Sequence, residues 1–561
     1  MDSQLTAWAL AAAQALLFIA AAPLLAGWLQ RVKCHTQNRA APALWQPYRN
    51  LAKLLRKRML LADNASWLFR AVPYIVFGAT LLAAAVVPLV AVNLPTAAIA
   101  DVIVLVAFFA LARFFTALAG LDIGTAFGGM GASREMMVAA LAEPAMLMAV
   151  FTLSMTANTT NLSVATEYLL HAGLVLRPSF LFALLALAMV AVAESSRVPV
   201  DNPATHLELT MLHEAMILEY GGRHLALIEW ASQIKLMIYS VFIVDLYFPL
   251  GIATDFGAKA LAIGVVAVTA KLMLLAVLLV VWETVLAKMR LFRVPQFLGF
   301  AFMLSLLGML THVVLETGIL MEFASLSLFN QAIILFAALA LFMSFIMLAQ
   351  ARMMPLIFTF AWQGLLLTVV SVLVAITSGH PELHISAAIT FCLKVVVIPW
   401  LLYRLSVKLN MQYDAEAITH PTLLLLGGVA LVIFSYHVSQ SIVHLSGLAT
   451  RNTIAVSMAI ELLGMLLMIA RKSAVAQVIG FMSMESGIFF AAVVSTYGMP
   501  LIVELGLAFD ILVASILFGV FFFHLKDSFG SLNVGQFNRL SEANQSMPTA
   551  DAAAPAPGEH A

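Results

Sequence analysis

The stretch GAKALAIGVVAVTAKLMLLAVLLVVWE, residues 257–283, decides the fold of this chain. It is apolar over almost its whole length and contains only three charged side chains, Lys259, Lys271 and Glu283. An α-helix rises about 1.5 Å per residue and the hydrocarbon core of a bilayer is about 30 Å thick, so about 20 mostly apolar residues cross it. We therefore predict a membrane-spanning helix here.

The same pattern recurs along the sequence. Of 561 residues, 63% are hydrophobic and 10% are charged, whereas soluble domains average about 45–50% apolar and about 25% charged residues. This composition excludes an ordinary soluble enzyme and predicts an all-α, polytopic integral membrane protein. Apolar runs bounded by charges, Pro or Gly predict about 15 spans, at 5–29, 67–92, 97–119, 136–157, 178–194, 230–252, 257–283, 294–317, 325–349, 355–377, 384–406, 422–438, 453–470, 474–497 and 500–524.

The distribution of Lys and Arg predicts how these spans are oriented. The 29 basic and 29 acidic residues balance to a net charge of zero, which gives no sign of a nucleic-acid partner. If the N-terminus lies outside and the spans alternate, 23 of the 29 basic residues fall in inner loops or at the inner ends of spans, and three fall in outer loops. Cytoplasmic loops are rich in Lys and Arg. The predicted topology is therefore eight plus seven spans, with the N-terminus outside and the C-terminus in the cytoplasm.

Three other features are read from composition. The two cysteines, Cys34 and Cys392, are too few for an iron–sulfur cluster, which takes about four thiolates, so we expect this chain itself to bind no cofactor and no metal. The segment LWQPYRNLAKLLRKRML at 44–60 is basic on one face and apolar on the other, which suits a helix lying in the inner membrane interface. Residues 541–561 are polar and rich in Ala and Pro, and we predict a disordered tail.

One inner loop, ESSRVPVDNPATHLELTMLHEAMILEYGGRHLALIEW at 194–230, is unusually rich in acids. Clustered carboxylates accept and release protons near neutral pH, because like charges and burial favour their protonated forms. A helix from about Thr205 would place Glu208 and Glu219 on one face, three turns apart. The alternative is a solvated loop whose charges meet water or a partner subunit.

Four charged residues are predicted near the membrane midplane. Lys394, Glu461, Glu485 and Asp510 each lie well inside a predicted span, at depths of roughly 12–17 Å. A charge at that depth costs at least about 2.5–3.5 kcal/mol on insertion scales. Two interpretations remain open: a hydrated row of proton-transfer groups, or static buried ion pairs in which Lys394 neutralises one of the acids.

Other charges within spans are weaker evidence. Arg113 is placed near an inner end, from which its side chain can reach the interface. Asp245 and Lys271 lie on adjacent spans, where they can form a structural pair. Glu143 is followed by Pro144, which can open the helix locally and admit water.

Three inner-face motifs now point to a family. AESSRVPVDNPATHLELTMLHEAMILEYGGRHLALIEWASQIKL at 193–236 resembles the signature loop of formate hydrogenlyase subunit 4 and hydrogenase-4 component C, the counterparts of respiratory complex I subunit 1. QPYRNLAKLLRK at 46–57 and GMGASREMMVAALAEPAML at 129–147 resemble that family's other two inner-face motifs. The resemblance covers residues 1–318 and implies an eight-helix subunit that holds the catalytic hydrogenase-like subunit and begins a proton channel. By motif position, it implies the following channel and interface acids: Glu135, Glu143, Glu194, Asp201, Glu208, Glu219 and Glu229.

The second half resembles a different subunit. TFCLKVVVIPWLLYRL at 390–405 and AFDILVASILFGVFFFHLKD at 508–527 are similar to hydrogenase-4 component E. The chain is thus predicted to be a fusion, with a component C-like membrane domain at 1–318, a component E-like membrane domain at 319–540 and the tail at 541–561. The row Lys394, Glu461, Glu485 and Asp510 belongs to the second domain.

These resemblances imply a membrane-arm subunit of a hydrogenase-4 or formate-hydrogenlyase-type complex in the bacterial inner membrane. It would anchor the peripheral redox arm and couple electron transfer there to proton or sodium translocation, without turnover of its own. The implied partners are hydrogenase-like large and small subunits, a ferredoxin-like iron–sulfur subunit and antiporter-like membrane subunits, with iron–sulfur clusters and, in some relatives, nickel–iron centres on those partners. The alternatives are a subunit of a quinone-reducing complex I-like dehydrogenase and a stand-alone ion transporter.

Overall fold

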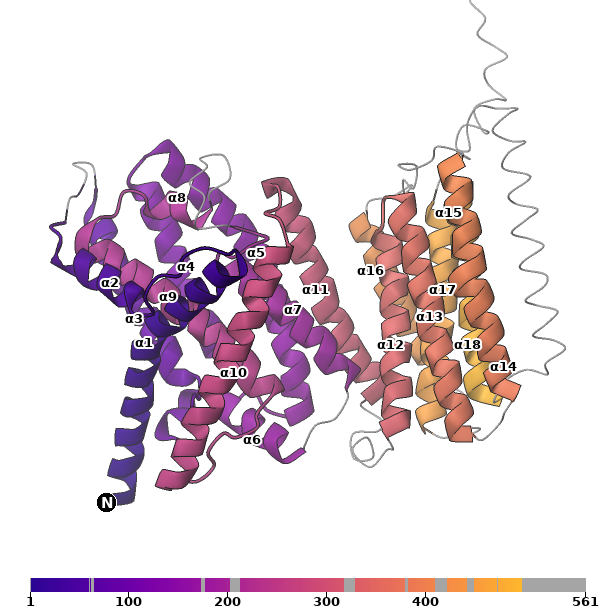
Figure 1. Ribbon diagram of the computed structural model, residues 1–561, viewed down its shortest axis with the longest axis horizontal. Coiled ribbons are helices and arrows are strands. Elements are labelled where there is room, and N and C mark those ends of the chain that lie inside the picture. The colour runs from indigo at the N-terminus through magenta and orange to yellow at the C-terminus, as the bar shows by residue number, and fades with distance from the viewer. Residues whose placement is uncertain are drawn as a thin grey trace, which may run out of the picture. The chain divides into compact units, whose positions relative to one another are not determined.

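The computed structural model describes residues 2–59, 61, 65–172, 177–201, 212–316, 328–378, 382–408, 421–440, 448–471 and 473–496. All regular secondary structure in these ranges is helical (Figure 1). Isolated β-bridges join Ala91 to Ala253 and Asp101 to Asn161. The all-α prediction is confirmed for this part of the chain.

The helices follow the predicted spans. Twelve helices in the described ranges are long and apolar enough to cross a membrane. Two shorter apolar helices, α7 (Pro178–Glu194) and α16 (Pro421–Gln440), coincide with the two shortest predicted spans. The span predicted at 500–524 and the tail at 541–561 lie outside the described residues. The orientation of the termini stays a prediction.

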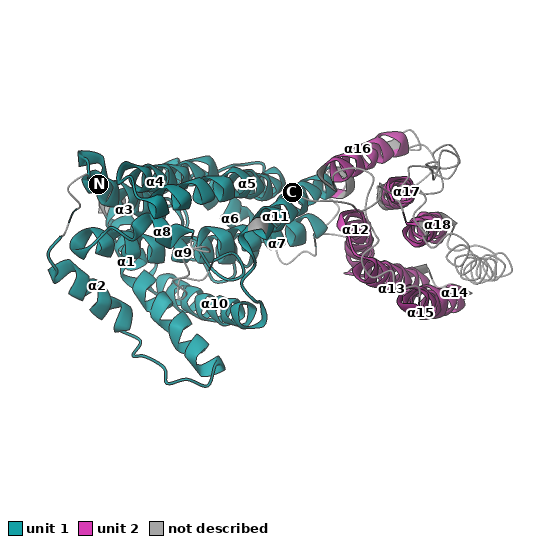
Figure 2. Cartoon of the chain, turned by 90° about the horizontal axis from the view of Figure 1, so that it is seen from above, with its two compact units in different colours: residues 1–313 teal, residues 314–561 magenta. Residues whose placement is uncertain are grey.

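The chain divides into two compact units, residues 1–313 and 314–561 (Figure 2). The predicted boundary at 318/319 lies a few residues further along. Unit 1 contains the elements α1 (Asp2–Thr36), α2 (Gln46–Arg56), α3 (Trp67–Val86), η1 (Pro95–Ile99), α4 (Val102–Asp122), α5 (Ala126–Ala157), α6 (Leu162–Ala172), α7, α8 (His213–Ile217), α9 (Gly222–Tyr247), α10 (Ala258–Val285), η2 (Leu291–Arg293), α11 (Val294–Thr311) and, at the boundary, the π-helix η3 (His312–Glu316).

Polar residues at the ends of apolar runs set the helix boundaries in unit 1. Ser66, Asp101 and Thr125 cap α3, α4 and α5, because each side chain accepts a hydrogen bond from a backbone N–H of the first turn. Asn158 ends α5 in the left-handed conformation, with φ 52°. These caps are visible in the sequence as single polar residues beside long apolar stretches.

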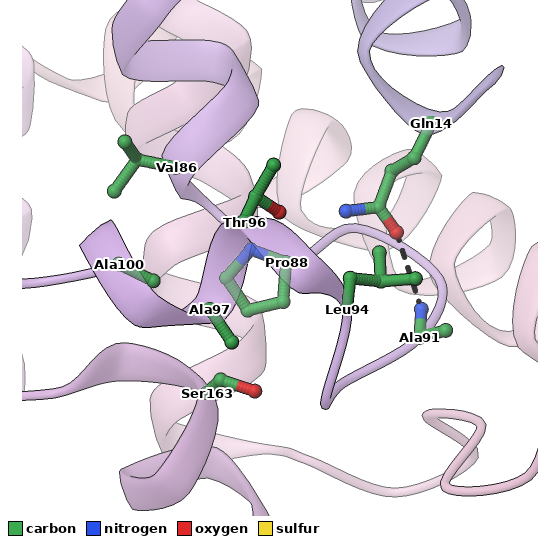
Figure 3. A pocket seen from close by; sticks show the side chains of 9 residues that line it. All are labelled: Gln14, Val86, Pro88, Ala91, Leu94, Thr96, Ala97, Ala100 and Ser163. Carbon is green, nitrogen blue, oxygen red and sulfur yellow. Dashed lines mark hydrogen bonds between the residues drawn. The ribbon is translucent and has the colours of Figure 1, made fainter. Parts of the chain in front are cut away.

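Two segments without α-helix join the helices of unit 1: residues 87–101, which are mostly buried and include η1, and residues 248–257, of which only Ile252 and Ala253 are buried. Backbone groups inside a membrane protein must find partners within the protein. Ala253 N–H donates to Val90 O at 2.9 Å and Val92 N–H donates to Ala253 O at 3.1 Å. The side-chain oxygen of Gln14 on α1 accepts from Val90 N–H at 3.2 Å and Ala91 N–H at 3.3 Å (Figure 3). The amide side chain of Gln14 thereby accepts the backbone hydrogen bonds that a neighbouring strand would otherwise accept, and it holds the apolar loop in position.

The predicted amphipathic helix is present as α2. Pro47 and Leu51 are buried against α9 and α1, whereas Arg49, Lys53 and Arg56 are exposed. The Tyr48 hydroxyl donates to Ala20 O on α1. The helix itself is confirmed, and its position in the membrane interface stays a prediction.

Unit 2 is a bundle whose long helices run side by side (Figure 1). Its described elements are α12 (Leu328–Ala349), α13 (Met353–Ser378), α14 (Glu382–Thr390), the π-helix η5 (Phe391–Val397), α15 (Ile398–Lys408), α16, α17 (Leu448–Ala470) and α18 (Ala474–Thr496). Arg471, between α17 and α18, is buried and donates to Met347 O at 3.0 Å and Leu348 O at 2.8 Å, which closes the C-terminus of α12. Burial lowers the pKa of the Arg471 guanidinium to about 10, so it is still charged at neutral pH.

Candidate functional site

Four helices of unit 1 bring two cations and two carboxylates together. Arg113 on α4 donates to Glu194 Oε1 on α7, and its Nη2 donates to Glu143 Oε1 on α5 at 2.6 Å. Lys235 Nζ on α9 donates to Glu194 Oε2 at 2.7 Å. We call Arg113, Glu143, Glu194 and Lys235 the Arg113 cluster.

The formal charges of the Arg113 cluster add up to zero, and its four side chains differ in their exposure. The side chains of Arg113 and Glu194 are 6% and 3% exposed, Lys235 is 19% exposed and Glu143 is 36% exposed. Buried charges are tolerated where they are paired and hydrogen-bonded. The Arg113 guanidinium is buried and paired with two acids, and its position relative to the membrane interface stays a prediction.

A small polar cavity lies beside the cluster. It is lined by Glu135, Glu194, Ser196, His213, Ser232 and Lys235, together with Arg113 and side chains of α3 and α4. The volume that the centres of water molecules can occupy inside the cavity is about 40 Å³, which is enough for about three water molecules. Carboxylates and an imidazole around such water can pass protons over short steps. The cavity therefore connects the buried acid Glu194 to Glu135 and to the loop residue His213.

A second set of ion pairs holds the acidic loop onto α10. Glu283 accepts from Lys33 Nζ of α1 at 2.7 Å and from Arg197 Nη1 at 3.1 Å. Asp201 accepts from Lys288 Nζ at 2.8 Å. The predicted acid Asp201 is thus buried and engaged in an ion pair. Within the described part of the loop, Glu194 and Asp201 are paired inside the protein, whereas Glu219 and Arg223 are exposed.

The remaining predicted acids of unit 1 are separated from the cluster. Glu229 on α9 is half-buried and lies near Glu214, so that the two like charges interact. Glu219 is exposed. Glu208 and the neighbouring residues 202–211 lie outside the described residues.

The helix predicted through Glu208 and Glu219 is wrong at its end. The helix α8 stops at Ile217, and Glu219 lies in the following turn. Gly222 explains the break: it has φ +57°, and a Cβ there would lie 2.7 Å from Arg58 O. Tyr220 fixes the turn, because its hydroxyl donates to Phe69 O at 2.9 Å and its ring stacks on Phe69. Burial raises the pKa of the Tyr220 phenol, so the hydroxyl stays a donor.

In unit 2, Lys394 lies in the π-helix η5 and faces α18. Its ammonium donates to Glu485 Oε1 at 3.2 Å and to Ser486 Oγ at 3.2 Å, and it lies 5.3 Å from the centre of the Phe489 ring. Gly364 on α13 allows this approach, since a Cβ there would lie 3.3 Å from Lys394 Cβ. Single-turn π-helices inside α-helices frequently occur at functional sites.

The structure places Glu461 at the level of this pair. Helices α17 and α18 touch through Gly487, where a Cβ would lie 2.6 Å from Glu461 N. Glu461 is half-buried, and Glu485 lies two residues before Gly487 on α18. Three of the four predicted mid-depth residues therefore lie in one layer of unit 2, and the fourth, Asp510, lies outside the described residues.

A buried polar chain that the sequence did not reveal crosses the same bundle. Gln363 on α13 is fully buried; its Nε2 donates to Ser344 Oγ on α12 at 2.8 Å and its Oε1 accepts from Ser483 Oγ on α18 at 3.1 Å. Ser483 and Ser486 are three residues apart on α18, so they lie on one face. The chain from Ser344 to Ser483 thus reaches the helix face that carries the contact to Lys394.

Comparison with known proteins assigns unit 1 to a family. The family model described as NADH dehydrogenase matches residues 9–316, more than half of the chain. The chain belongs to the NADH dehydrogenase family. The matched region runs from α1 to η3 and includes the whole Arg113 cluster.

Three curated relatives, all from Escherichia coli (strain K12), refine this placement. Formate hydrogenlyase subunit 4 is 33% identical over 294 residues, which cover 52% of this chain and 95% of that protein. Hydrogenase-4 component C is 30% identical over 302 residues, 54% of this chain and 94% of that protein. Hydrogenase-4 component E is 22% identical over 181 residues, 32% of this chain and 84% of that protein.

The sequence analysis singled out Glu194 and Asp201 of this NADH dehydrogenase-family unit, but it predicted neither Glu283 as a site residue nor the pairing of these acids with basic residues. Lys235 and Arg113 neutralise Glu194, and Lys33, Arg197 and Lys288 neutralise Glu283 and Asp201. Each basic residue lies within about two turns of a predicted inner end, where a charge is expected anyway. Which helices are neighbours decides the pairing, and no single sequence reports that. Among the described residues, no group of three His, Cys, Asp or Glu side chains is placed to hold a metal ion.

Proposed function

We propose that this chain is a membrane-arm subunit of a hydrogenase-4 or formate-hydrogenlyase-type complex in the bacterial inner membrane. It anchors a peripheral redox arm and couples electron transfer there to proton or sodium translocation. Membership of the NADH dehydrogenase family and similarity to formate hydrogenlyase subunit 4 and hydrogenase-4 component C support this proposal. Similarity to hydrogenase-4 component E supports a fused second subunit.

One observation carries the proposal: the Arg113 cluster beside its polar cavity. Glu194 is almost fully buried. It lines the cavity together with its partners Arg113 and Lys235, and Glu135 and His213 line the same cavity. A change of charge near the inner loop can therefore act on a buried acid through water and ion pairs. The Lys394–Glu485 pair is a second ion pair of largely buried side chains, in unit 2.

The proposed partners follow from this role. Hydrogenase-like large and small subunits, a ferredoxin-like subunit and antiporter-like membrane subunits would carry the redox arm and the rest of the membrane arm. Iron–sulfur clusters, and nickel–iron where the large subunit has the ligands, would lie on those partners. The chain contributes ionisable groups and an anchoring surface.

The test is Glu194→Gln in the assembled complex, with electron transfer and ion translocation measured separately in vesicles. We expect fewer ions moved per electron, because the amide can no longer exchange a proton with the cavity. Asp255→Asn is the control, since Asp255 is an exposed acid of the segment before α10 and is not among the predicted channel and interface acids. Unchanged pumping at unchanged turnover in Glu194→Gln, Glu485→Gln and Lys394→Ala would exclude the channel assignment.

A quinone-reducing relative is the second candidate, and α2 favours it. This basic, amphipathic helix packs on α1 and α9 and leaves Trp45 60% exposed beside it, an arrangement suited to bordering an entrance for an apolar substrate from the membrane. Reduction of an added quinone by the purified complex with its natural electron donor would favour this function over the first.

A further inference from the structure

A buried carboxylate and a buried ammonium without hydrogen-bond partners lie on α9 and α10, away from the Arg113 cluster. Asp245 is 2% exposed, and neither of its carboxylate oxygens accepts a hydrogen bond from the protein. Lys271 is half-buried, but its Nζ atom is inaccessible to solvent and donates to no atom of the described residues. Buried polar groups are almost always hydrogen-bonded. Three orphaned atoms on two facing helices therefore call for a common explanation.

The two side chains lie at one level. After α9 ends, Gly251 turns the chain with φ +84° and comes so close to α10 that a Cβ there would lie 2.6 Å from Ala267 Cβ. Ala267 is one turn from Lys271 and Gly251 is six residues from Asp245. The charge of Lys271 acts on Asp245, yet the two groups form no direct ion pair. An unpartnered acceptor on α9 and an unpartnered donor on α10 thus lie close enough for their charges to interact.

Few other charges face this pair. The helix α6, which also packs on α9, carries Glu167 and His171, but Glu167 accepts from Asn93 Nδ2 at 2.9 Å and His171 Nδ1 lies 2.9 Å from Glu167 O. The Tyr247 ring contacts Phe180 on α7 edge-on. Arg177, the buried residue directly before α7, lies 5.6 Å from the centre of the same Phe180 ring. The paired residues Lys33 and Glu194 lie near the C-terminal ends of α1 and α7. Within the described residues, Lys271 is the charge that acts on Asp245.

We propose that Asp245 and Lys271 bind water between them and hold one exchangeable proton, forming a second buried proton site in unit 1. In the transfer, the Lys271 ammonium gives a proton to the water while the water gives one to an Asp245 oxygen. One N–H bond breaks and one O–H bond forms. The charged pair becomes a neutral amine and a neutral carboxyl, and the net charge of the site does not change.

Physical chemistry favours such a site over a static ion pair or a metal site. Separated buried charges lose their hydration without gaining the full attraction of direct contact, so the neutral form of the pair is close in free energy to the charged form. A metal cation is disfavoured because the Lys271 ammonium repels it. Water fits, because it donates to a carboxylate and accepts from an ammonium at once.

The experiment is infrared spectroscopy of the full chain reconstituted in lipid bilayers, in ordinary and heavy water. Aspartate labelled isotopically at the side-chain carboxyl carbon identifies the C=O band of a protonated aspartic acid in the unmutated chain. We expect one such band, a shift of it in heavy water, its loss in Asp245→Asn and its increase in Lys271→Met. Asp255→Asn, which removes an exposed acid of the following loop, should leave it unchanged.

Three results would overturn the proposal. They are the absence of a protonated-aspartate band in both the unmutated chain and Lys271→Met, a band that survives Asp245→Asn, and a band that does not shift in heavy water. The measurement needs neither partner subunits nor turnover. Its failure is therefore distinct from a failure of the function proposed above.

Discussion

At the scale of single residues, Glu194 is the buried acid that joins two basic residues in unit 1. One carboxylate receives a guanidinium on Oε1 and an ammonium on Oε2, and the three groups come from α7, α4 and α9. Removing one member of a buried ion pair leaves the others without compensation. The stability of the helix arrangement and the chemistry of the site therefore depend on the same side chain.

We expect Glu194→Gln to lower the free energy of unfolding of the purified chain by about 3–5 kcal/mol, because Arg113 and Lys235 lose their shared buried counter-charge. Glu219→Gln, at an exposed turn, should change it by no more than about 0.5 kcal/mol. Equilibrium unfolding in detergent measures both. Equal effects of the two variants would contradict the arrangement of the cluster.

A double-mutant cycle tests the contact between Lys394 and Glu485. We expect Lys394→Met and Glu485→Leu each to destabilise the chain, because each leaves one buried charge unpaired. The double variant should cost less than the two single costs together, with a coupling of about 0.5–3 kcal/mol. Thermal unfolding of the four proteins provides the comparison, and additive costs would show that the pair is not a stabilising contact.

Sequence reasoning was strongest for residue type and weakest for residue pairing. The acids of the inner loop and the mid-depth group of unit 2 were found because charge is rare in apolar runs. The basic partners Lys33, Lys235 and Lys288 were missed, since a Lys near an inner helix end is expected without any specific role. Gln363 was missed because a lone polar residue in a span gives no sign of the two serines it joins.

At the scale of helices, α17 and α18 show what the small residues of unit 2 do. Gly464, Gly480 and Gly487 are positions where a Cβ would lie 2.4–2.7 Å from backbone atoms of the facing helix. Membrane helices associate through close packing at small residues. This contact brings the Glu461 backbone beside the helix that carries Glu485.

We expect Gly464→Ala to destabilise unit 2 by about 1–3 kcal/mol, because its Cβ would overlap the backbone of Met484 and force the helices apart. Gly427→Ala on α16 is the matched control. Its Cβ meets nothing closer than Leu466 Cδ2 at 3.9 Å, and Ala favours a helix over Gly by about 0.5–1 kcal/mol. Thermal unfolding should therefore move in opposite directions for the two variants.

Helix boundaries were predictable where a cap or a proline marks them, as at Asp101 and Pro178. The non-helical segment 87–101 was not, because its residues are as apolar as those of a span and were partly assigned to two spans. Its backbone conformation depends on Gln14 and Ala253, which are distant in the sequence. The break after Ile217 is similar: the pair Gly221–Gly222 was visible, but its close approach to Arg58 was not.

At the scale of the whole molecule, the charge asymmetry makes a prediction about orientation. With other cysteines removed, we expect Lys259→Cys to react with a membrane-impermeant maleimide in intact cells. Lys53→Cys should react only after permeabilisation, because basic inner loops stay in the cytoplasm. Both side chains are exposed. The opposite labelling pattern would reverse the predicted topology of unit 1.

The division into two units agrees with the change in resemblance along the chain, and the fused second half stays a proposal. Composition was enough to predict many membrane helices, since 63% hydrophobic residues leave few other folds. It was not enough to predict how they are grouped. That depends on particular contacts, such as Arg471 with the end of α12.

The hydrogen bonds of Gln14 have a consequence for how the protein is made. Its acceptor oxygen leaves the ribosome 76 residues before the Val90 N–H that binds it. At about 5–20 residues per second, this amide waits for about 4–15 seconds in the nascent chain. During that time the first helix carries an unmatched polar group, and it reaches its final place only when the third helix and the loop behind it have been synthesised. The opening segment of the chain thus reaches its final place only after residues 90 and 91 have been made.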